Sequence, residues 1–339
     1  MKKTLLAVLV VFLLAFCAVS CQDGSSQETM EAESETEAES EIITDTYTRK
    51  GNTIYIGSYP QSKVTDKSIT DELSTLAGAL PAEGNSGAWT SYNYYIEGEI
   101  CEYMWYIDVE YNGNSYRGVY FTKYRPYEPN AKEPFPRITS SPVYQYDNGY
   151  FTQTLYWFKY EPIAWTVVAE EDGVATLLCN TVLEGQSYLY PAHKSDDICD
   201  NNYAHSTVRT WLNDDFYSFA FNEIQKSAIL STVVDNSAAS TASKDNYYAC
   251  PNTSDQIFLP SYQELCAYSN QKINLDRVSS DYAKCQGVRI IKDQALWRLR
   301  SPDDEYSNIA LCVVGSTFNS GYTTNTNSVG VVPSMRIKL

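Results

Sequence analysis

The sequence predicts an α+β fold built on antiparallel sheets, with a block of helices in the second half of the chain. Three features of the 339 residues indicate it. Strand-forming runs separated by turn residues fill residues 47–184, helix-capping patterns gather within residues 185–339, and strand-like runs return near the C-terminus. This order favours an α+β arrangement over a doubly wound parallel sheet.

The first 20 residues have the pattern of an export signal. Lys2 and Lys3 precede an apolar run of twelve residues, 5–16, which is shorter than the roughly 20 residues that a membrane-spanning helix needs. The run leads to Ala18-Val19-Ser20-Cys21, which resembles the lipobox of bacterial lipoproteins. We therefore expect cleavage before Cys21 and acylation of its thiol. The expected location is outside the cytoplasm, at the cell surface or in the periplasm, with a lipid bilayer as a partner.

Residues 21–46 comprise the cysteine expected to be lipidated and the tether predicted after it. The segment after Cys21 holds nine acidic residues, no Lys or Arg and no aromatic residue before Tyr47. It has too little apolar surface to offset the entropy of folding, and its like charges repel one another. We expect a disordered acidic linker, with a helix as the alternative, and a single large domain over residues 47–339.

Strands dominate residues 47–184. The run 53–59 reads as a strand that Pro60 ends, because proline lacks the N–H that a sheet requires. Residues 66–80 read as a short amphipathic helix. Asn112-Gly113 predicts a hairpin between strands at 99–110 and 115–122, and Asp172-Gly173 predicts another between 164–169 and 174–178.

Residues 185–339 bring helices, each predicted from its cap. Ser206 caps a helix over 207–213, Asn222 with Gln225 opens a second, and Ser261 with Glu264 opens a third after a strand at 256–259. Further strands are expected at 296–300, 309–314 and 329–339. The polar, tyrosine-containing run 318–325 between them has the composition of an exposed binding loop.

Composition excludes several functional classes. A net charge of −17 and a pI near 4.5 argue against a nucleic-acid partner, since phosphate binding needs a basic surface. Only two histidines are present, and no Cys-x-x-Cys spacing occurs. We therefore expect no metal, no cofactor and no catalytic residues.

Several stretches together resemble an uncharacterised family of bacterial domains, domain of unknown function 6273. They are residues 116–126, 148–165, 206–221, 299–302 and 330–337. The resemblance covers nearly all of the chain beyond the tether. The family's C-terminal pattern is in turn distantly similar to sulfatase-modifying-factor and C-type-lectin-like folds, which implies such a fold for this chain by analogy.

This analogy suggests two specific activities, a copper-dependent oxidase and a calcium-dependent lectin, and each set of residues also has a simpler structural explanation. A thiol pair such as Cys285 and Cys312 would serve a copper-dependent oxidase, although Cys179 and Cys312 fit buried apolar positions better. Cys199 and Cys250 lie in polar segments where a disulfide could form. Calcium-binding oxygens of the lectin type could come from residues 128–130 and 211–214, which lie far apart in the sequence.

The function that we predict is a lipid-anchored module that binds a glycan or a protein, without chemistry of its own. Its candidate ligand-binding residues are Trp297, Arg300, Phe318, Asn319 and Tyr322. The alternative is an exported enzyme, a thiol-dependent oxidoreductase or hydrolase. For the hydrolase, Cys199 between His193 and His205 offers a nucleophile and a base.

Overall fold

The computed structural model describes residues 41–82, 84–92, 95–96, 99–100, 104–122, 149–151, 153–315 and 317–339. The side chains of residues 95, 96, 99, 100, 319 and 320 are not described. The chain divides into two units, Met1–Ala38 and Glu39–Leu339. The predicted export signal, Cys21 and most of the predicted tether lie outside the described residues. Within the described residues, no helix combines the length and apolar character that crossing a membrane requires.

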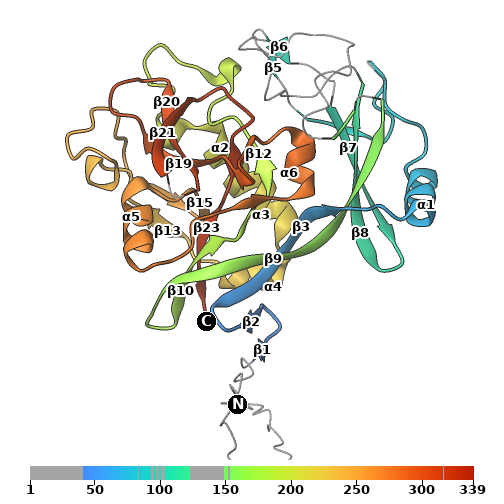
Figure 1. Ribbon diagram of the computed structural model, residues 1–339, viewed down its shortest axis with the longest axis horizontal. Helices are drawn as coiled ribbons and strands as arrows, with labels where there is room; N and C mark the ends of the chain where they lie inside the picture. The colour runs from blue at the N-terminus through green and yellow to red at the C-terminus, as the bar shows by residue number, and fades with distance from the viewer. Residues whose placement is uncertain are drawn as a thin grey trace, which may run out of the picture. The chain divides into compact units, whose positions relative to one another are not determined.

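A ten-stranded antiparallel sheet runs through the second unit (Figure 1). Its central path is β1 (Glu41–Ile43), β2 (Thr48–Lys50), β3 (Thr53–Lys63), β9 (Leu155–Glu171), β10 (Val174–Cys179), β23 (Ser334–Lys338) and β15 (Ile257–Phe258). Strand β8 (Asn114–Phe121) pairs with the first part of β9, and β7 (Met104–Tyr111) and β4 (Thr90–Ser91) follow it. Strand pairing therefore begins at Glu41, inside the segment predicted to be a tether.

The long strand β9 connects these parts of the sheet. Its first residues pair with β8 and its last with β10, while β3 lies along its other edge. The prediction that Pro60 ends the preceding strand was wrong, because β3 continues to Lys63. The register shifts between Pro60 and Ser62, and such irregularities are where a sheet accommodates a residue that lacks an N–H. Pro162 likewise lies within β9, which begins nine residues before the strand predicted at 164–169.

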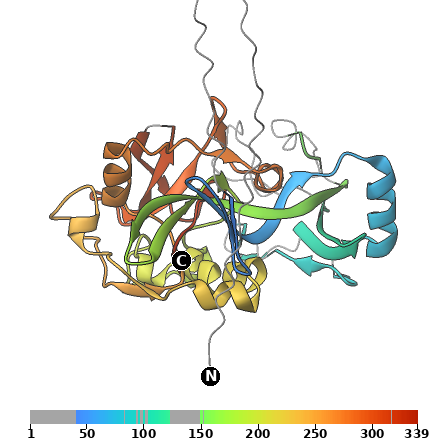
Figure 2. The ribbon, with the colours of Figure 1, turned by 90° about the horizontal axis from the view of Figure 1, so that it is seen from below.

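Helix α1 (Lys67–Ala77) lies beside β7 and β8 (Figure 2) and covers an apolar cluster there. The helix predicted over 66–80 is confirmed over the range 67–77, and Asp66 caps it, since its carboxylate accepts from the N–H of Ser68. The cluster contains Trp105 and Trp157, both about 1% exposed. The hairpin between β7 and β8 is also confirmed: Asn112 and Gly113 have φ values of 48° and 73°. The strand predicted over 99–110 is instead two, β6 (Glu99–Ile100) and β7, and β6 pairs with β5 (Tyr95–Ile96).

The helical block is confirmed in the second half. Helix α2 (Thr207–Trp211) begins at the Ser206 cap and continues as a π-helical turn, η4 (Leu212–Phe216), and α3 (Tyr217–Ala220). Both predicted capping boxes are present, on α4 (Glu223–Ala228) and α5 (Tyr262–Asn270). Helix α6 (Asp281–Gln286), which was not predicted, packs on β3 and on β12 (Glu184–Gly185). Short 3₁₀ turns are η2 (Pro191–His193), η3 (Tyr203–His205) and η5 (Ala238–Ser240).

A five-stranded sheet forms the remainder of the C-terminal part, in the order β12, β22, β19, β20 and β21. These strands span Glu184–Gly185, Gly330–Val331, Trp297–Pro302, Ile309–Val314 and Thr317–Thr323. Within the described part of residues 181–339 there are also three two-stranded pairs: β11 (Thr181–Val182) with β16 (Val278–Ser279), β13 (Thr232–Val234) with β14 (Thr253–Asp255), and β17 (Ile290–Ile291) with β18 (Gln294–Ala295). Sheets with a minority of short helices make this an α+β fold, as predicted.

Candidate functional site

Trp297 and Arg300, two of the five candidate ligand-binding residues, lie inside the protein on β19. Trp297 is 0% exposed and Arg300 is 2% exposed. The Arg300 guanidinium forms two parallel hydrogen bonds with Glu264, at 2.7 and 2.8 Å, and donates to the carbonyl oxygens of Leu259 and Asp235. Arg300 therefore joins β19 to the start of α5.

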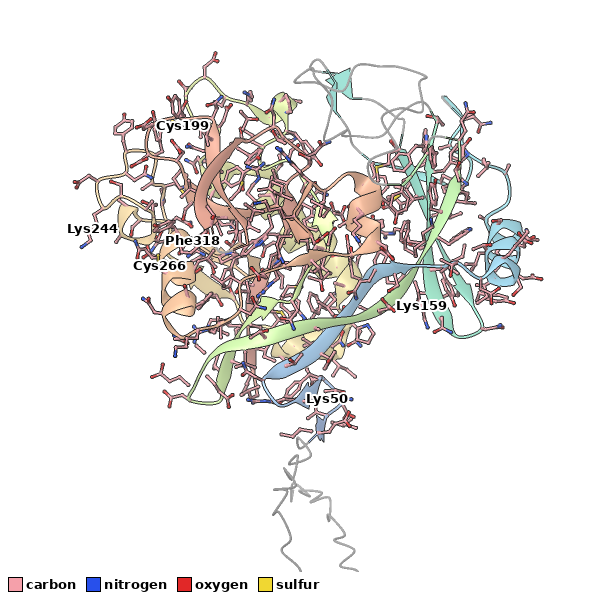
Figure 3. The ribbon with its side chains drawn as sticks, in the orientation of Figure 1. Lys50, Lys159, Cys199, Lys244, Cys266 and Phe318 are labelled. Atoms are coloured by element: carbon pink, nitrogen blue, oxygen red, sulfur yellow. The ribbon has the colours of Figure 1, made fainter. Side chains whose placement is uncertain are left out.

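The other three candidates lie on the edge strand β21. The Phe318 ring packs against Tyr262 of α5, with 5.3 Å between ring centroids (Figure 3). The Tyr322 hydroxyl accepts a hydrogen bond from Arg289 at 2.9 Å. The backbone of Asn319 belongs to β21, and its side chain lies outside the described residues. Ligand binding by these five residues stays a prediction. The run 318–325, which was expected to be an exposed loop, is a strand as far as Thr323.

Four of the six cysteines that the structure describes are buried. Cys179, Cys199, Cys250, Cys266 and Cys312 are not in disulfides, so the structure contains no bridge between Cys199 and Cys250. Burial raises the pKa of the Cys312 thiol to about 11 and that of Cys179 to about 12. Because thiolate is the reactive form, these two thiols are poor nucleophiles.

The structure does bring Cys199 close to both histidines. His193, Cys199 and His205 line one pocket of about 270 Å³ together with Ser195 and Asn202. Among the described residues, no hydrogen bond joins Cys199 to either ring, and no group of His, Cys, Asp and Glu is arranged to hold a metal ion. Of the proposed calcium ligands, residues 128–130 lie outside the described residues, and Trp211 packs against Phe216.

A buried polar network, the Glu184 network, was not predicted. Glu184 is 2% exposed and accepts hydrogen bonds from the Tyr59 hydroxyl and from the side-chain amides of Gln186 and Gln286, the last two at 3.1 and 2.9 Å. Burial raises the pKa of Glu184 above its ordinary value of 4.5, although the hydrogen bonds oppose the shift. Burial therefore makes the Glu184 carboxyl easier to protonate in the folded protein than in the unfolded chain, while the hydrogen bonds reduce this effect.

Arg117 extends this network into the β7–β8 hairpin. Its guanidinium pairs with Asp108 through two hydrogen bonds of 2.8 and 2.7 Å and donates to the Tyr282 hydroxyl at 3.2 Å. Aromatic rings surround it, with its central carbon 4.3 Å from the centroid of Tyr106 and 5.8 Å from that of Phe219. These contacts join residues from β7, β8, α3 and α6. The one signal in the sequence was a single glutamate directly after the apolar pair Val182-Leu183.

A pocket of about 580 Å³ lies beside the partly exposed ring of Phe219. We call it the Phe219 groove. Phe219 is 53% exposed. Its walls come from the turn between β1 and β2, the start of β3, Pro162 of β9, and the junction of α3 and α4; they are Thr44, Asp45, Thr46, Tyr47, Thr48, Tyr55, Ile56, Gly57, Ser58, Pro162, Phe219, Ala220, Phe221, Asn222 and Gln225.

The capping box of α4 gives this groove hydrogen-bond donors. The Asn222 side-chain oxygen accepts from the N–H of Gln225, and the Gln225 side-chain oxygen accepts from the N–H of Asn222, at 3.0 and 3.1 Å. Both bonds use the oxygen atoms, so the two NH₂ groups have no partner among the described residues. The hydroxyls of Tyr47 and Tyr55 have none there either. The groove thus combines exposed aromatic surface with unused polar groups.

Comparison with known families agrees with part of the expected resemblance. Residues 172–339 match the family described as Domain of unknown function (DUF6273). The matched range contains three of the five stretches on which the resemblance was based, and the stretches at 116–126 and 148–165 precede it. No curated protein gives a significant match to the chain. No solved structure gives one either.

Proposed function

We propose that this chain is an exported bacterial lipoprotein whose folded domain binds a glycan in the Phe219 groove. The observation that carries the proposal is the pairing of an exposed aromatic ring, Phe219, with two unused amide donors, on Asn222 and Gln225. Sugar rings present C–H groups on their faces and hydroxyls at their edges, so they suit aromatic rings beside hydrogen-bonding groups.

The groove is open and its polar groups are neutral except for Asp45. This favours a neutral oligosaccharide over an anionic one. A protein ligand is the competing partner, and a flat apolar patch would suit it better. We also propose that the C-terminal part is distantly related to sulfatase-modifying-factor and C-type-lectin-like folds. The support for this proposal is the sequence resemblance alone.

We expect the full chain, purified in detergent, to bind neutral glycans on an array, and replacement of Phe219 to abolish most of that binding. In Phe219→Leu the bulk beside Arg117 stays while the aromatic face is lost, so affinity should fall about tenfold, which corresponds to about 1.4 kcal/mol. Titration calorimetry with the best glycan measures the change, and the melting temperature checks the fold.

Tyr247→Leu is the matched control, because Tyr247 is 86% exposed and lies outside the groove. Its affinity should equal that of the unmodified protein. Equal affinity in Phe219→Leu, or an array on which no neutral glycan binds, would refute the proposed ligand.

The anchor is tested separately. Cys21→Ser removes the thiol that we propose to be acylated, so the protein should move from the membrane fraction to the soluble fraction. Cys17→Ser, which leaves Cys21 intact, should stay at the membrane. Fractionation followed by immunoblotting measures both, and continued membrane retention of Cys21→Ser would contradict the anchor.

A further inference from the structure

A third pocket, of about 540 Å³, lies at the turn between β2 and β3, next to the loop that follows α5. We call it the Arg277 pocket. Its walls are Asn52, Thr166, Asn180, Gln271, Lys272, Ile273, Asn274, Asp276 and Arg277. No aromatic residue lines it, and Ile273 is the one apolar side chain in its wall. Its chemistry therefore differs from that of the Phe219 groove.

Arg277 is a buried cation with an unused donor. It is 3% exposed, and its Nε donates to the carbonyl oxygen of Cys179 at 2.7 Å. Its Nη1 donates to the carbonyl oxygens of Asn274 and Asp276. Its Nη2 is buried and has no partner among the described residues. A buried charged donor without an acceptor is destabilising, so an acceptor brought in by a ligand would be favourable there.

Other donors surround the same pocket. The oxygen of the Asn180 side chain accepts from Thr166 at 2.6 Å, and that of Asn274 accepts from the N–H of Asp276 at 2.9 Å. In both cases the amide NH₂ has no partner among the described residues. Lys272 is exposed and forms no ion pair with a described residue. Lys272, Arg277 and the amide side chains of Asn180 and Asn274 thus line a pocket whose one carboxylate is that of Asp276.

We propose that the Arg277 pocket binds a sugar acid, a sugar that carries a carboxylate. The carboxylate is the acceptor for Arg277 and Lys272, because guanidinium and carboxylate groups match in geometry and charge. The amides of Asn180 and Asn274 and the Asp276 carboxylate bind the hydroxyls. Since Nη2 is covered in this structure, binding requires a small displacement of the exposed loop 271–274.

Titration calorimetry of the full chain in detergent with glucuronate, glucose and acetate tests the proposal at low salt. We expect glucuronate to bind at least tenfold more tightly than either comparison compound. Amide hydrogen exchange in residues 271–276 should slow when glucuronate binds. Glucose binding as tightly as glucuronate would overturn the role of the carboxylate, and equally tight acetate would overturn the role of the sugar.

Lys272→Asn is the variant of choice, because Lys272 has a φ of 60°, a left-handed conformation that asparagine tolerates. Glucuronate affinity should fall three- to tenfold in this variant with no change in melting temperature. The control is Lys244→Asn, an exposed lysine outside the pocket (Figure 3). An unchanged affinity in Lys272→Asn would refute the site. Phe219→Leu should bind glucuronate normally, so failure of this site and failure of the proposed groove are distinguishable.

Discussion

Arg300→Met should lower the free energy of unfolding by about 3 kcal/mol, the lower end of the range observed when one partner of a buried ion pair is removed, because the Glu264 carboxylate is partly exposed. Methionine fills much of the volume of arginine but cannot donate to Glu264, Leu259 or Asp235. Glu264 would then keep its charge at a site where its side chain is only 34% exposed. The midpoint of urea unfolding, followed by tryptophan fluorescence, measures the loss.

Lys226→Met provides the comparison for this prediction. Lys226 pairs with Glu223 at 3.0 Å, and the Glu223 side chain is 90% exposed, so removing this pair should change the unfolding free energy by less than about 1 kcal/mol. If both variants unfold at the same urea concentration, Arg300 is not the structural link described above. A stable Arg300→Met protein that had lost ligand binding would instead support the site predicted from the sequence.

Local signals predicted the parts of the fold that depend on neighbouring residues. Asn112-Gly113 specifies a turn because both residues adopt positive φ, and Ser261 with Glu264 specifies a helix start because each side chain bonds the other's backbone. These interactions span four residues or fewer. They form wherever the local sequence permits, so composition and spacing identify them.

The prolines were misleading because a strand's tolerance of proline depends on its partners. Pro60 lies in β3 where the register with β9 shifts, and Pro162 is exposed within β9. Neither pairing can be predicted from the proline itself. The run 318–325 was misleading for a related reason: β21 is the edge of its sheet, and edge strands carry polar residues that resemble those of loops.

The Glu184 network and the two pockets lay beyond prediction because they assemble from distant segments. Tyr59 and Glu184 are 125 residues apart, and Arg117 and Tyr282 are 165 apart. Each residue alone reads as an ordinary strand or helix position. Phe219 and Arg277 likewise line pockets whose other walls come from distant parts of the chain, such as residues 44–48 for Phe219 and Asn52 for Arg277. No local sequence pattern links these segments.

Glu184→Gln should remove a pH dependence of stability that the unmodified protein has. Because the pKa of Glu184 is raised in the folded state, the folded protein holds a proton that the unfolded chain has released once the pH exceeds about 4.5. Between that pH and the folded-state pKa, the free energy of unfolding therefore falls as the pH rises, by about 1.4 kcal/mol per unit at most for one proton.

Glutamine keeps the shape of this side chain and is uncharged. Its oxygen can accept from Gln186 and Gln286, as the Glu184 oxygen does, and its NH₂ can donate to the Tyr59 hydroxyl. The difference in unfolding free energy between Glu184→Gln and the unmodified protein should grow in favour of the variant as the pH rises from 4.5. Urea unfolding at a series of pH values measures this difference, so that the other titrating groups cancel. Glu171→Gln, an exposed position at the end of β9, should show no such trend. Parallel profiles for Glu184→Gln and the unmodified protein would mean that Glu184 is as readily ionised in the folded state as in the unfolded chain.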